Sequence, residues 1–184
     1  MKTCRIMVIR HAEKPNEDGS VQGVNSNGSA NPQALSVLGW QRAGALVSFF
    51  TSFTGGGAEH IEKPEFLFAP RPTEKAPSER ALQTLQPLAG FIGKTVSTQF
   101  QKGQEADLVA HIAQLPGAVL VAWEHKAIVD IGNALMGGRD ETPQSWPDER
   151  FDLVWVFERA GSDTSWRFFQ VPEQLLSGDR SESI

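Results

Sequence analysis

The sequence predicts an α/β fold, specifically a three-layer α/β/α sandwich built on a mostly parallel central sheet. Short continuous apolar runs, typical of strands buried on both faces, alternate along the chain with longer segments of helical periodicity. Such alternation is characteristic of sheets whose strands are joined by covering helices. The 184 residues, 40% of them hydrophobic, contain no internal repeat or long linker, so we expect a single domain over residues 1–184.

The N-terminal part is predicted to hold one strand, one long loop and the start of a helix. Residues 4–9 form an apolar run, typical of a buried strand, which stops at Arg10 and His11. Residues 17–33 are rich in glycine and asparagine and lack periodicity, which indicates a loop. Apolar side chains then recur near helical spacing from about Ser36 onward, and this predicts the first helix.

The middle of the chain is predicted to add a second strand and a second helix. A glycine run at 55–57 ends the first helix before a short apolar strand at 66–69. Ser78 has the side chain of a good N-cap, and the apolar residues after it share one helical face. Pro87 is predicted to kink that helix, because proline cannot donate the backbone hydrogen bond.

The C-terminal half is predicted to complete the sheet. A short strand near 96–100 precedes a third helix, and 119–123 form a second continuous apolar strand that another helix follows. The chain closes with strands at 151–157 and 166–171, joined as a hairpin through 161–163. The apolar residues that mark the third helix are Leu108, Ile112 and Leu115.

Charge and composition narrow the classes of partner. Seventeen basic and 22 acidic residues give a net charge of −5, and without a Lys/Arg-rich run we expect no nucleic-acid partner. No apolar run is long enough to span a membrane, so no membrane partner is expected. Cys4 is the single cysteine, which excludes an intrachain disulfide. The N-terminus lacks the apolar stretch of a signal peptide, so a cytoplasmic location is expected. The sequence does not indicate an oligomeric state.

The two most apolar strands end in histidines. The first run stops at Arg10-His11 and the later one at Glu124-His125. In sheets of this class, ligands bind beyond the carboxyl ends of the strands. Both histidines are therefore predicted to lie at the functional edge of the sheet. Because the chain is acidic overall, an anionic substrate would require positive charge to be concentrated locally at that edge.

Four motifs occur in order at the boundaries of the predicted elements. They are Arg-His-Ala-Glu at 10–13, Leu-Ser-Val-Leu-Gly-Trp-Gln-Arg-Ala at 35–43, Arg-Ala-Leu-Gln-Thr at 80–84 and Glu-His at 124–125. In this order they resemble the histidine phosphatase superfamily, which has the phosphoglycerate-mutase-like fold. The resemblance spans roughly residues 6–135. Alanine stands at position 12 where the family has glycine, which is a mild change if the backbone there avoids positive φ.

The resemblance implies a phosphatase that hydrolyses a phosphomonoester through a phosphohistidine, with no metal and no organic cofactor. His11 is the implied nucleophile, because a neutral imidazole nitrogen attacks phosphorus readily and divides hydrolysis into two easier steps. The planar guanidinium groups of Arg10 and Arg80 can each bind two phosphate oxygens at once. His125 completes the clamp as a charged donor. The neighbouring cations are expected to lower the pKa of His11 and keep it neutral.

The proton donor is left open among three carboxylates. A phosphomonoester leaves as an alkoxide and therefore requires a general acid. Glu105 lies on the loop after the third strand, where the mutase branch has its glutamate, and is ranked first. Glu124 is ranked closely behind it. Neighbouring residues of a strand point to opposite faces, so Glu124 reaches the site only if the chain turns at the end of its strand. Glu13, which follows the nucleophile, is the third candidate.

Other residues near the motifs receive weaker assignments. Glu13 and Lys14 follow His11 closely in the sequence and are predicted to contact the substrate. The loop 13–33, which they begin, is predicted to border the pocket as a lid or selectivity element. Arg71 and Lys75 could reach the site from their loop, but they are interpreted as solvated loop charges. The absence of a large cap favours a hydrolase. A mutase-type phosphotransferase and a catalytically weak phosphate-binding module remain the alternatives.

Overall fold

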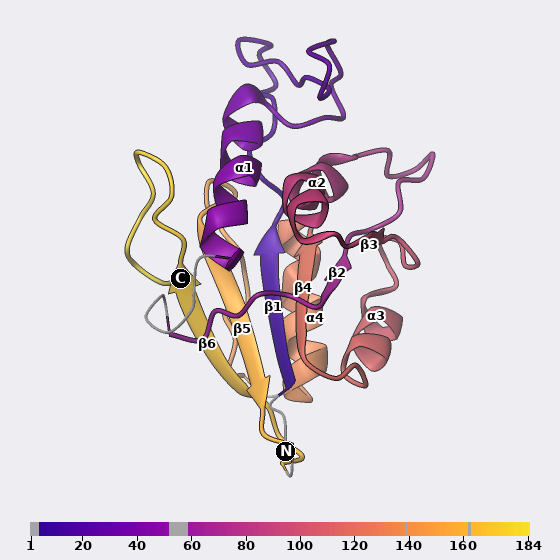
Figure 1. Cartoon of the computed structure of the whole chain (residues 1–184), viewed down its shortest axis with the longest axis vertical. Helices are drawn as coiled ribbons and strands as arrows, with labels where there is room; N and C mark the ends of the chain where they lie inside the picture. The colour runs from indigo at the N-terminus through magenta and orange to yellow at the C-terminus, as the bar shows by residue number, and fades with distance from the viewer. Residues whose placement is uncertain (1–3, 52–58, 139, 162) are drawn as a thin grey trace.

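The computed structural model describes residues 4–51, 59–138, 140–161 and 163–184, and its centre is a six-stranded sheet with the order β3-β2-β4-β1-β5-β6 (Figure 1). The first four strands in this order pair in parallel. Their bounds are Val96–Ser97 for β3, Phe66–Phe68 for β2, Ala118–Trp123 for β4 and Cys4–Arg10 for β1. The expected α/β fold with a mostly parallel sheet is confirmed.

The remaining two strands form the hairpin expected at the C-terminal end. β5 (Leu153–Arg159) is antiparallel both to β1 and to β6 (Arg167–Pro172). Ser162, in the predicted connection, and the glycine run at 55–57 lie outside the described residues. The third helix was expected to include Leu115, but α3 ends at Ile112 and Leu115 lies in the turns that lead to β4.

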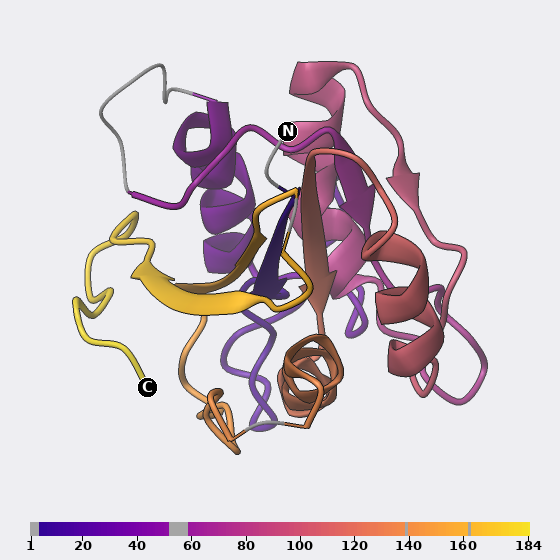
Figure 2. The same ribbon diagram turned by 90° about the horizontal axis from the view of Figure 1, so that it is seen from below.

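Two helices cover each face of the sheet (Figure 2). α1 (Val37–Thr51) and α2 (Arg80–Ile92) pack on one face, and α3 (Glu105–Ile112) and α4 (His125–Met136) pack on the other. Alternate residues of β1 divide between these layers, as the twofold repeat of a strand requires. Ile6 and Val8 face α3 and α4, whereas Met7 and Ile9 face α1 and α2.

The start of α2 differs from the prediction. Glu79 is the N-cap in place of Ser78, and Arg80 is therefore the first helical residue. A tertiary contact accounts for the shift, because the Glu79 N–H donates to the Gln33 carbonyl at 3.1 Å. The Ser78 hydroxyl instead accepts a 3.4 Å hydrogen bond from Arg80. The hydrogen bond from Glu79 to the loop before α1 therefore fixes the residue at which α2 begins.

The carboxyl ends of β1 and β4 lie side by side. Arg10 pairs with Trp123 in the parallel register, and the His11 N–H donates to the Trp123 carbonyl at 3.0 Å. α4 begins at His125, two residues beyond this pair. The register thus brings both predicted histidines to one edge of the sheet, which is the upper edge in Figure 1.

The loop 17–33 is organised by its own polar side chains. The Val21 and Ser20 amides are bound by the carboxamide of Asn16 and the carboxylate of Asp18, at 2.6 and 2.9 Å. The Trp40 indole anchors the loop to α1 by donating to the Val24 carbonyl at 2.8 Å. These short-range turns explain why the segment has no periodicity yet returns to the edge that carries His11.

Gly39 lets α1 approach the residue that follows the His11 turn. A Cβ at Gly39 would lie 2.4 Å from the Glu13 carbonyl oxygen, a contact that backbone cannot relieve easily. We expect Gly39→Ala to lower the free energy of unfolding by roughly 1–3 kcal/mol, the usual cost of overpacking. Urea denaturation followed by circular dichroism measures this change.

Gly44 supplies the matched control, because it lies in the same helix and a Cβ there meets nothing within 4 Å. Gly44→Ala is expected to raise the free energy of unfolding by up to about 1 kcal/mol, since alanine is the better helix former. Equal effects of the two substitutions would contradict the packing argument.

Candidate active site

His11 is held in one tautomer by the backbone. Its ring is 6% exposed, and Nδ1 lies 2.8 Å from the Ala12 carbonyl oxygen. A carbonyl oxygen only accepts hydrogen bonds, so Nδ1 carries the proton and Nε2 keeps its lone pair. Ala12 is not among the described residues with positive φ, so alanine is tolerated at this position. The arrangement leaves Nε2 as the free nucleophilic atom of His11.

The surroundings of His11 keep its ring neutral. The pKa of His11 is lowered to about 3, chiefly by burial and in addition by the charges of Arg10, Arg80 and His125. The hydrogen bond to Ala12 acts in the opposite direction. At neutral pH the imidazole is therefore uncharged, as the sequence predicted.

The motif on α2 fixes the helix against the nucleophile's loop. The Thr84 hydroxyl accepts a 2.8 Å hydrogen bond from the Ala12 N–H and donates to the Arg80 carbonyl. The Gln83 side chain accepts the N–H of Leu35 at 2.8 Å. These bonds give the glutamine and threonine of the motif a positioning role, because they connect the start of α2 to the His11 turn.

Arg10 is buried beside the nucleophile, and two of its guanidinium nitrogens have no hydrogen-bond partner among the described residues. Its side chain is 1% exposed, and Nη1 donates to the carbonyls of Pro147, Asp148 and Arg150. The guanidinium carbon lies 3.8 Å from the centre of the Phe151 ring. Within the described part of the chain, Nε and Nη2 have no hydrogen-bond partner. Buried donors of this kind are rare, and an oxyanion would satisfy them.

Burial also lowers the pKa of Arg10, to about 10, which leaves the guanidinium charged at neutral pH. The carboxylates of Asp148 and Glu124 act in the opposite direction and favour the charged form. Arg10 therefore presents a permanent cation next to the neutral ring of His11.

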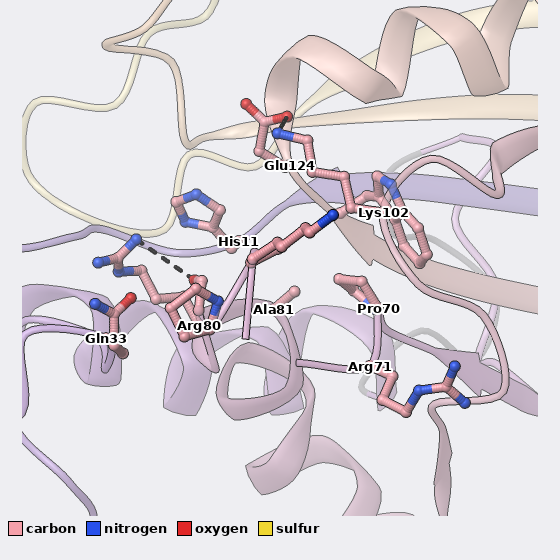
Figure 3. A pocket seen from close by; sticks show the side chains of 13 residues that line it. His11, Gln33, Pro70, Arg71, Arg80, Ala81, Lys102 and Glu124 are labelled. Carbon is pink, nitrogen blue, oxygen red and sulfur yellow. Dashed lines mark hydrogen bonds and ion pairs between the residues drawn. The ribbon is translucent and has the colours of Figure 1, made fainter. Parts of the chain in front are cut away.

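A cavity of about 230 Å³ opens over His11 (Figure 3). His11 and Arg80 line one side, and Trp123 and Glu124 line it from the carboxyl end of β4. The Arg80 guanidinium is held by the carbonyls of Ala34 and Pro32, at 3.2 and 2.7 Å. Arg80 thus lies where the sequence predicted, next to the nucleophile.

Positive charge is concentrated in this cavity although the chain carries −5 overall. Arg71, Lys75 and Lys102 line it together with Arg80, and Glu124 is the one carboxylate among its lining residues. Arg71 and Lys75 are exposed loop residues, as expected, and the connection before α2 also brings both to the cavity. Lys102 adds a cation from the loop after β3 that sequence reasoning missed.

His125 lies close enough to His11 for its charge to affect the pKa of that ring. It does not line the His11 cavity, and Asp148 Oδ1 lies 2.5 Å from its Nε2. Burial, followed by the charge of Arg10, lowers the pKa of His125. The ring was predicted to be a charged donor, whereas burial and the charge of Arg10 favour its neutral form in the free protein.

The candidate proton donors lie in different surroundings. Glu124 lines the cavity, where Oε2 is 3.0 Å from Lys102 and Oε1 is 3.3 Å from Nδ1 of His125. Glu105 is the first residue of α3 and is not among the lining residues. Its Oε1 accepts the Trp123 indole N–H at 2.9 Å and the Gly103 N–H at 3.0 Å. Glu105, the candidate ranked first, therefore supports Trp123 in the cavity wall and does not itself line the cavity.

Glu13 does not face the cavity. Its Oε1 accepts two hydrogen bonds from Arg42, at 2.8 and 2.9 Å. Arg42 also binds Glu173 and Asp179, so three carboxylates surround one buried guanidinium. The structure thus contradicts the assignment of Glu13 as a substrate contact, because tertiary folding places α1 and the C-terminal segment against its side chain.

Glu173 gives this cluster a pH dependence. Burial raises its pKa to about 8, and the charges of Asp179 and Glu13 act in the same direction. A folded-state pKa above the unfolded value means that the stabilisation is complete below about pH 4.5 and is lost as pH rises through 8. We expect Glu173→Gln to flatten the dependence of Tm on pH in this window and to raise Tm at pH 8.5.

Differential scanning calorimetry from pH 5 to 9 measures this effect. Glu59→Gln is the control, because the Glu59 side chain is 91% exposed. A Glu173→Gln protein whose Tm falls with pH as steeply as in the wild type would refute the assignment.

Lys14 lines a separate groove that meets the His11 cavity at Arg80. The loops 14–23 and 30–32 form this groove of about 510 Å³, and Arg80 lines both hollows. Lys14 was predicted to contact the substrate; it does not line the His11 cavity itself, although Gln33 at the end of the same loop does. The loop borders the site as expected, but its earlier residues line the adjoining groove and not the cavity itself.

Sequence reasoning missed several residues of the site. Lys102 stands three positions before Glu105 on the same predicted loop, so its place after a strand was an available signal. Asp148 had no comparable signal, because it follows α4 by a dozen residues and reaches His125 through the path of the chain. Among the described residues, no group of three or more His, Cys, Asp or Glu side chains is arranged to hold a metal ion, and no helix is long and apolar enough to cross a membrane.

Comparison with known proteins places this geometry in a recognised fold. No family model and no curated sequence matches the chain. Among solved structures, an Escherichia coli protein assigned as an alpha-ribazole-5'-phosphate phosphatase has a TM-score of 0.57 at 13% identity, over 89% of this chain and 94% of its own. A mycobacterial glucosyl-3-phosphoglycerate phosphatase has a TM-score of 0.52 at 17% identity, over 91% and 97% of the two chains. The ecdysone phosphate phosphatase of Bombyx mori, in complex with tungstate, has a TM-score of 0.53 at 12% identity, over 98% and 96%.

The chain therefore has the phosphoglycerate-mutase-like α/β fold of the histidine phosphatase superfamily. The similar structures are phosphatases, and the mycobacterial enzyme has also been solved with VO3. The resemblance recognised in the four sequence motifs is confirmed at the level of the fold.

Proposed function

We propose that this protein is a phosphatase that hydrolyses a phosphomonoester through a phosphohistidine on His11, without a metal ion. The observation that carries the proposal is the pairing of two features at one edge of the sheet. Nε2 of His11 keeps its lone pair, and beside it Arg10 holds two buried donor nitrogens without a partner. A nucleophile next to unsatisfied cationic donors is the arrangement that phosphoryl transfer requires.

The first step forms a bond between Nε2 of His11 and phosphorus and breaks the bond from phosphorus to the ester oxygen. Negative charge then lies on the three equatorial oxygens, where Arg10 and Arg80 are the available donors. The leaving alkoxide takes a proton from a carboxylic acid. In the second step water attacks phosphorus, the carboxylate takes its proton, the N–P bond breaks and inorganic phosphate leaves.

Glu124 is our choice for the proton donor. Of the residues that the structure describes, it is the one carboxylate lining the cavity, whereas Glu105 and Glu13 are engaged by Trp123 and Arg42. The hydrogen bond and charge of Lys102 outweigh the effect of burial and lower the pKa of Glu124. A phosphate dianion nearby would raise that pKa again, so protonation of Glu124 is coupled to substrate binding.

The direct test is hydrolysis of p-nitrophenyl phosphate in the presence of EDTA. We expect steady release of nitrophenolate and phosphate that EDTA does not diminish. A mutase-type enzyme would instead pass the phosphoryl group to an alcohol acceptor, so the ratio of phosphate to nitrophenolate would fall below one. A phosphate-binding module would bind phosphate without turnover.

Substitution of the two candidate acids separates their roles. We expect Glu124→Gln to lower kcat for alkyl phosphates by roughly 10²–10⁴-fold, the range of general acid catalysis, and to affect p-nitrophenyl phosphate much less. Nitrophenolate is a good leaving group and needs little protonation. Glu105→Gln keeps an acceptor for the Trp123 indole, so it should change both substrates equally and slightly. A larger alkyl-specific loss in Glu105→Gln would reverse the assignment.

A further inference from the structure

The His11 cavity has a second cationic region away from the nucleophile. Figure 3 shows Pro70 and Arg71 on the side of the cavity remote from His11 and Arg80, while the Lys102 side chain extends toward Glu124. Arg71 and Lys75 come from the connection between β2 and α2, and Lys102 comes from the loop between β3 and α3. Loops after two neighbouring parallel strands thus deliver three cations to the same cavity.

Two of these cations lack an anionic partner within the described part of the chain. Lys102 is paired with Glu124 at 3.0 Å. Arg71 donates to the neutral Gln101 side chain at 3.1 Å, and no described carboxylate lies within ion-pair distance of Arg71 or Lys75. In a chain with a net charge of −5, unpaired cations gathered at a cavity wall favour an anionic ligand.

The adjoining groove has no such excess of positive charge. Lys14 and Glu17 offset each other there, and the other lining side chains are amides or apolar apart from the shared Arg80. A neutral polar group would fit that groove, whereas an anionic group is favoured in the His11 cavity. The cavity of about 230 Å³ is below the usual size of a drug-like ligand site, which favours a small leaving group.

We infer that the substrate carries a second anionic group, a carboxylate or another phosphate, and that Arg71 and Lys75 bind it while the scissile phosphate lies at His11. This inference rests on the proposed phosphatase function and specifies its substrate class. The leaving group is a small acid or phosphorylated alcohol whose anionic end reaches the wall formed by the β2–α2 loop. Arg71 and Lys75 are then specificity residues that take no part in the bond exchange.

A matched pair of substrates tests this inference. Glycerol 3-phosphate and 3-phosphoglycerate share a three-carbon skeleton and differ in a neutral hydroxymethyl group against a carboxylate. We expect wild-type kcat/KM to favour 3-phosphoglycerate by about tenfold or more, which is the scale of two partly exposed ion pairs. The preference should shrink as NaCl rises to about 0.5 M, because salt screens such pairs.

The variant Arg71→Ala/Lys75→Ala should bring the preference close to one, chiefly through KM for 3-phosphoglycerate. Arg71→Gln/Lys75→Gln repeats the test with polar side chains of similar length, and both positions are exposed enough to tolerate the change. The control Lys63→Ala/Lys94→Ala removes two exposed cations that precede β2 and follow α2, at the other edge of the sheet. It should keep the wild-type preference.

The outcomes separate this inference from the function on which it rests. A wild-type preference of one or less, or a preference unchanged in both double variants, overturns the second anion site while the phosphatase stands. A wild-type protein that hydrolyses neither glycerol 3-phosphate, 3-phosphoglycerate nor p-nitrophenyl phosphate overturns the proposed function, and the inference with it.

Discussion

His11→Gln is expected to lower kcat for every phosphomonoester by at least about 10⁴-fold, the scale on which loss of a catalytic nucleophile acts. The expectation follows from the free lone pair on Nε2, which Nδ1 secures by donating to the Ala12 carbonyl. The glutamine side chain retains an N–H for that carbonyl and offers no comparable nucleophile. Steady-state phosphate release measures the effect.

Covalent labelling gives an independent measurement of the same prediction. Wild-type protein quenched during turnover of a ³²P-labelled substrate should carry phosphate that is stable to base and labile to acid. His11→Gln should carry none. His111→Gln is the control, because His111 is an exposed residue of α3 that contacts Phe68 and Phe100. Undiminished labelling or turnover in His11→Gln would remove the phosphohistidine from the mechanism.

Arg10→Lys is expected to lower kcat/KM by roughly 10²–10³-fold, the usual cost of removing one preorganised donor to a transition state. Lysine keeps the positive charge but loses the two guanidinium nitrogens that have no partner in the described structure. The apparent Ki for vanadate, a phosphate mimic, should rise in parallel. This parallel change would identify Arg10 as a ligand of the phosphoryl oxygens.

The structural role of Arg10 has to be separated from its binding role. Nη1 donates to the carbonyls of Pro147, Asp148 and Arg150, so any substitution also loosens the segment after α4. Activity and vanadate binding are therefore compared well below the Tm of both proteins. A fall in Tm with an unchanged Ki for vanadate would show that Arg10 serves only to hold that segment.

The Arg42 cluster has a bearing on both predictions. Arg42 connects Glu13, two residues beyond the nucleophile, with Glu173 and Asp179 near the C-terminus. Because Glu173 titrates near pH 8, the anchoring of the His11 turn changes with pH independently of the chemistry. Rates at alkaline pH are best compared in the Glu173→Gln background, where this contribution is absent.

Local patterns in the sequence determined the class of fold and the edge that carries chemistry. The apolar runs ending at His11 and His125 correspond to β1 and β4, since a strand buried on both faces needs apolar side chains at every position. The neighbouring carboxyl ends of these strands follow from parallel pairing. The Arg-x-x-Gln-Thr motif likewise marked the start of α2, although Ser78 misplaced the cap by one residue.

Only the tertiary structure decided which side chains share the cavity. Glu105 lies close to Lys102 in the sequence, yet its carboxylate binds the Trp123 indole. Glu13 is close to His11 in the sequence, yet its carboxylate binds Arg42. Arg71 and Lys75 reach the cavity from the connection between β2 and α2, and Glu124 reaches it from the end of β4. Periodicity reports the face on which a residue lies, whereas the partner of a polar side chain depends on desolvation and on charges brought together from distant parts of the chain. That information exists only once the layers have packed.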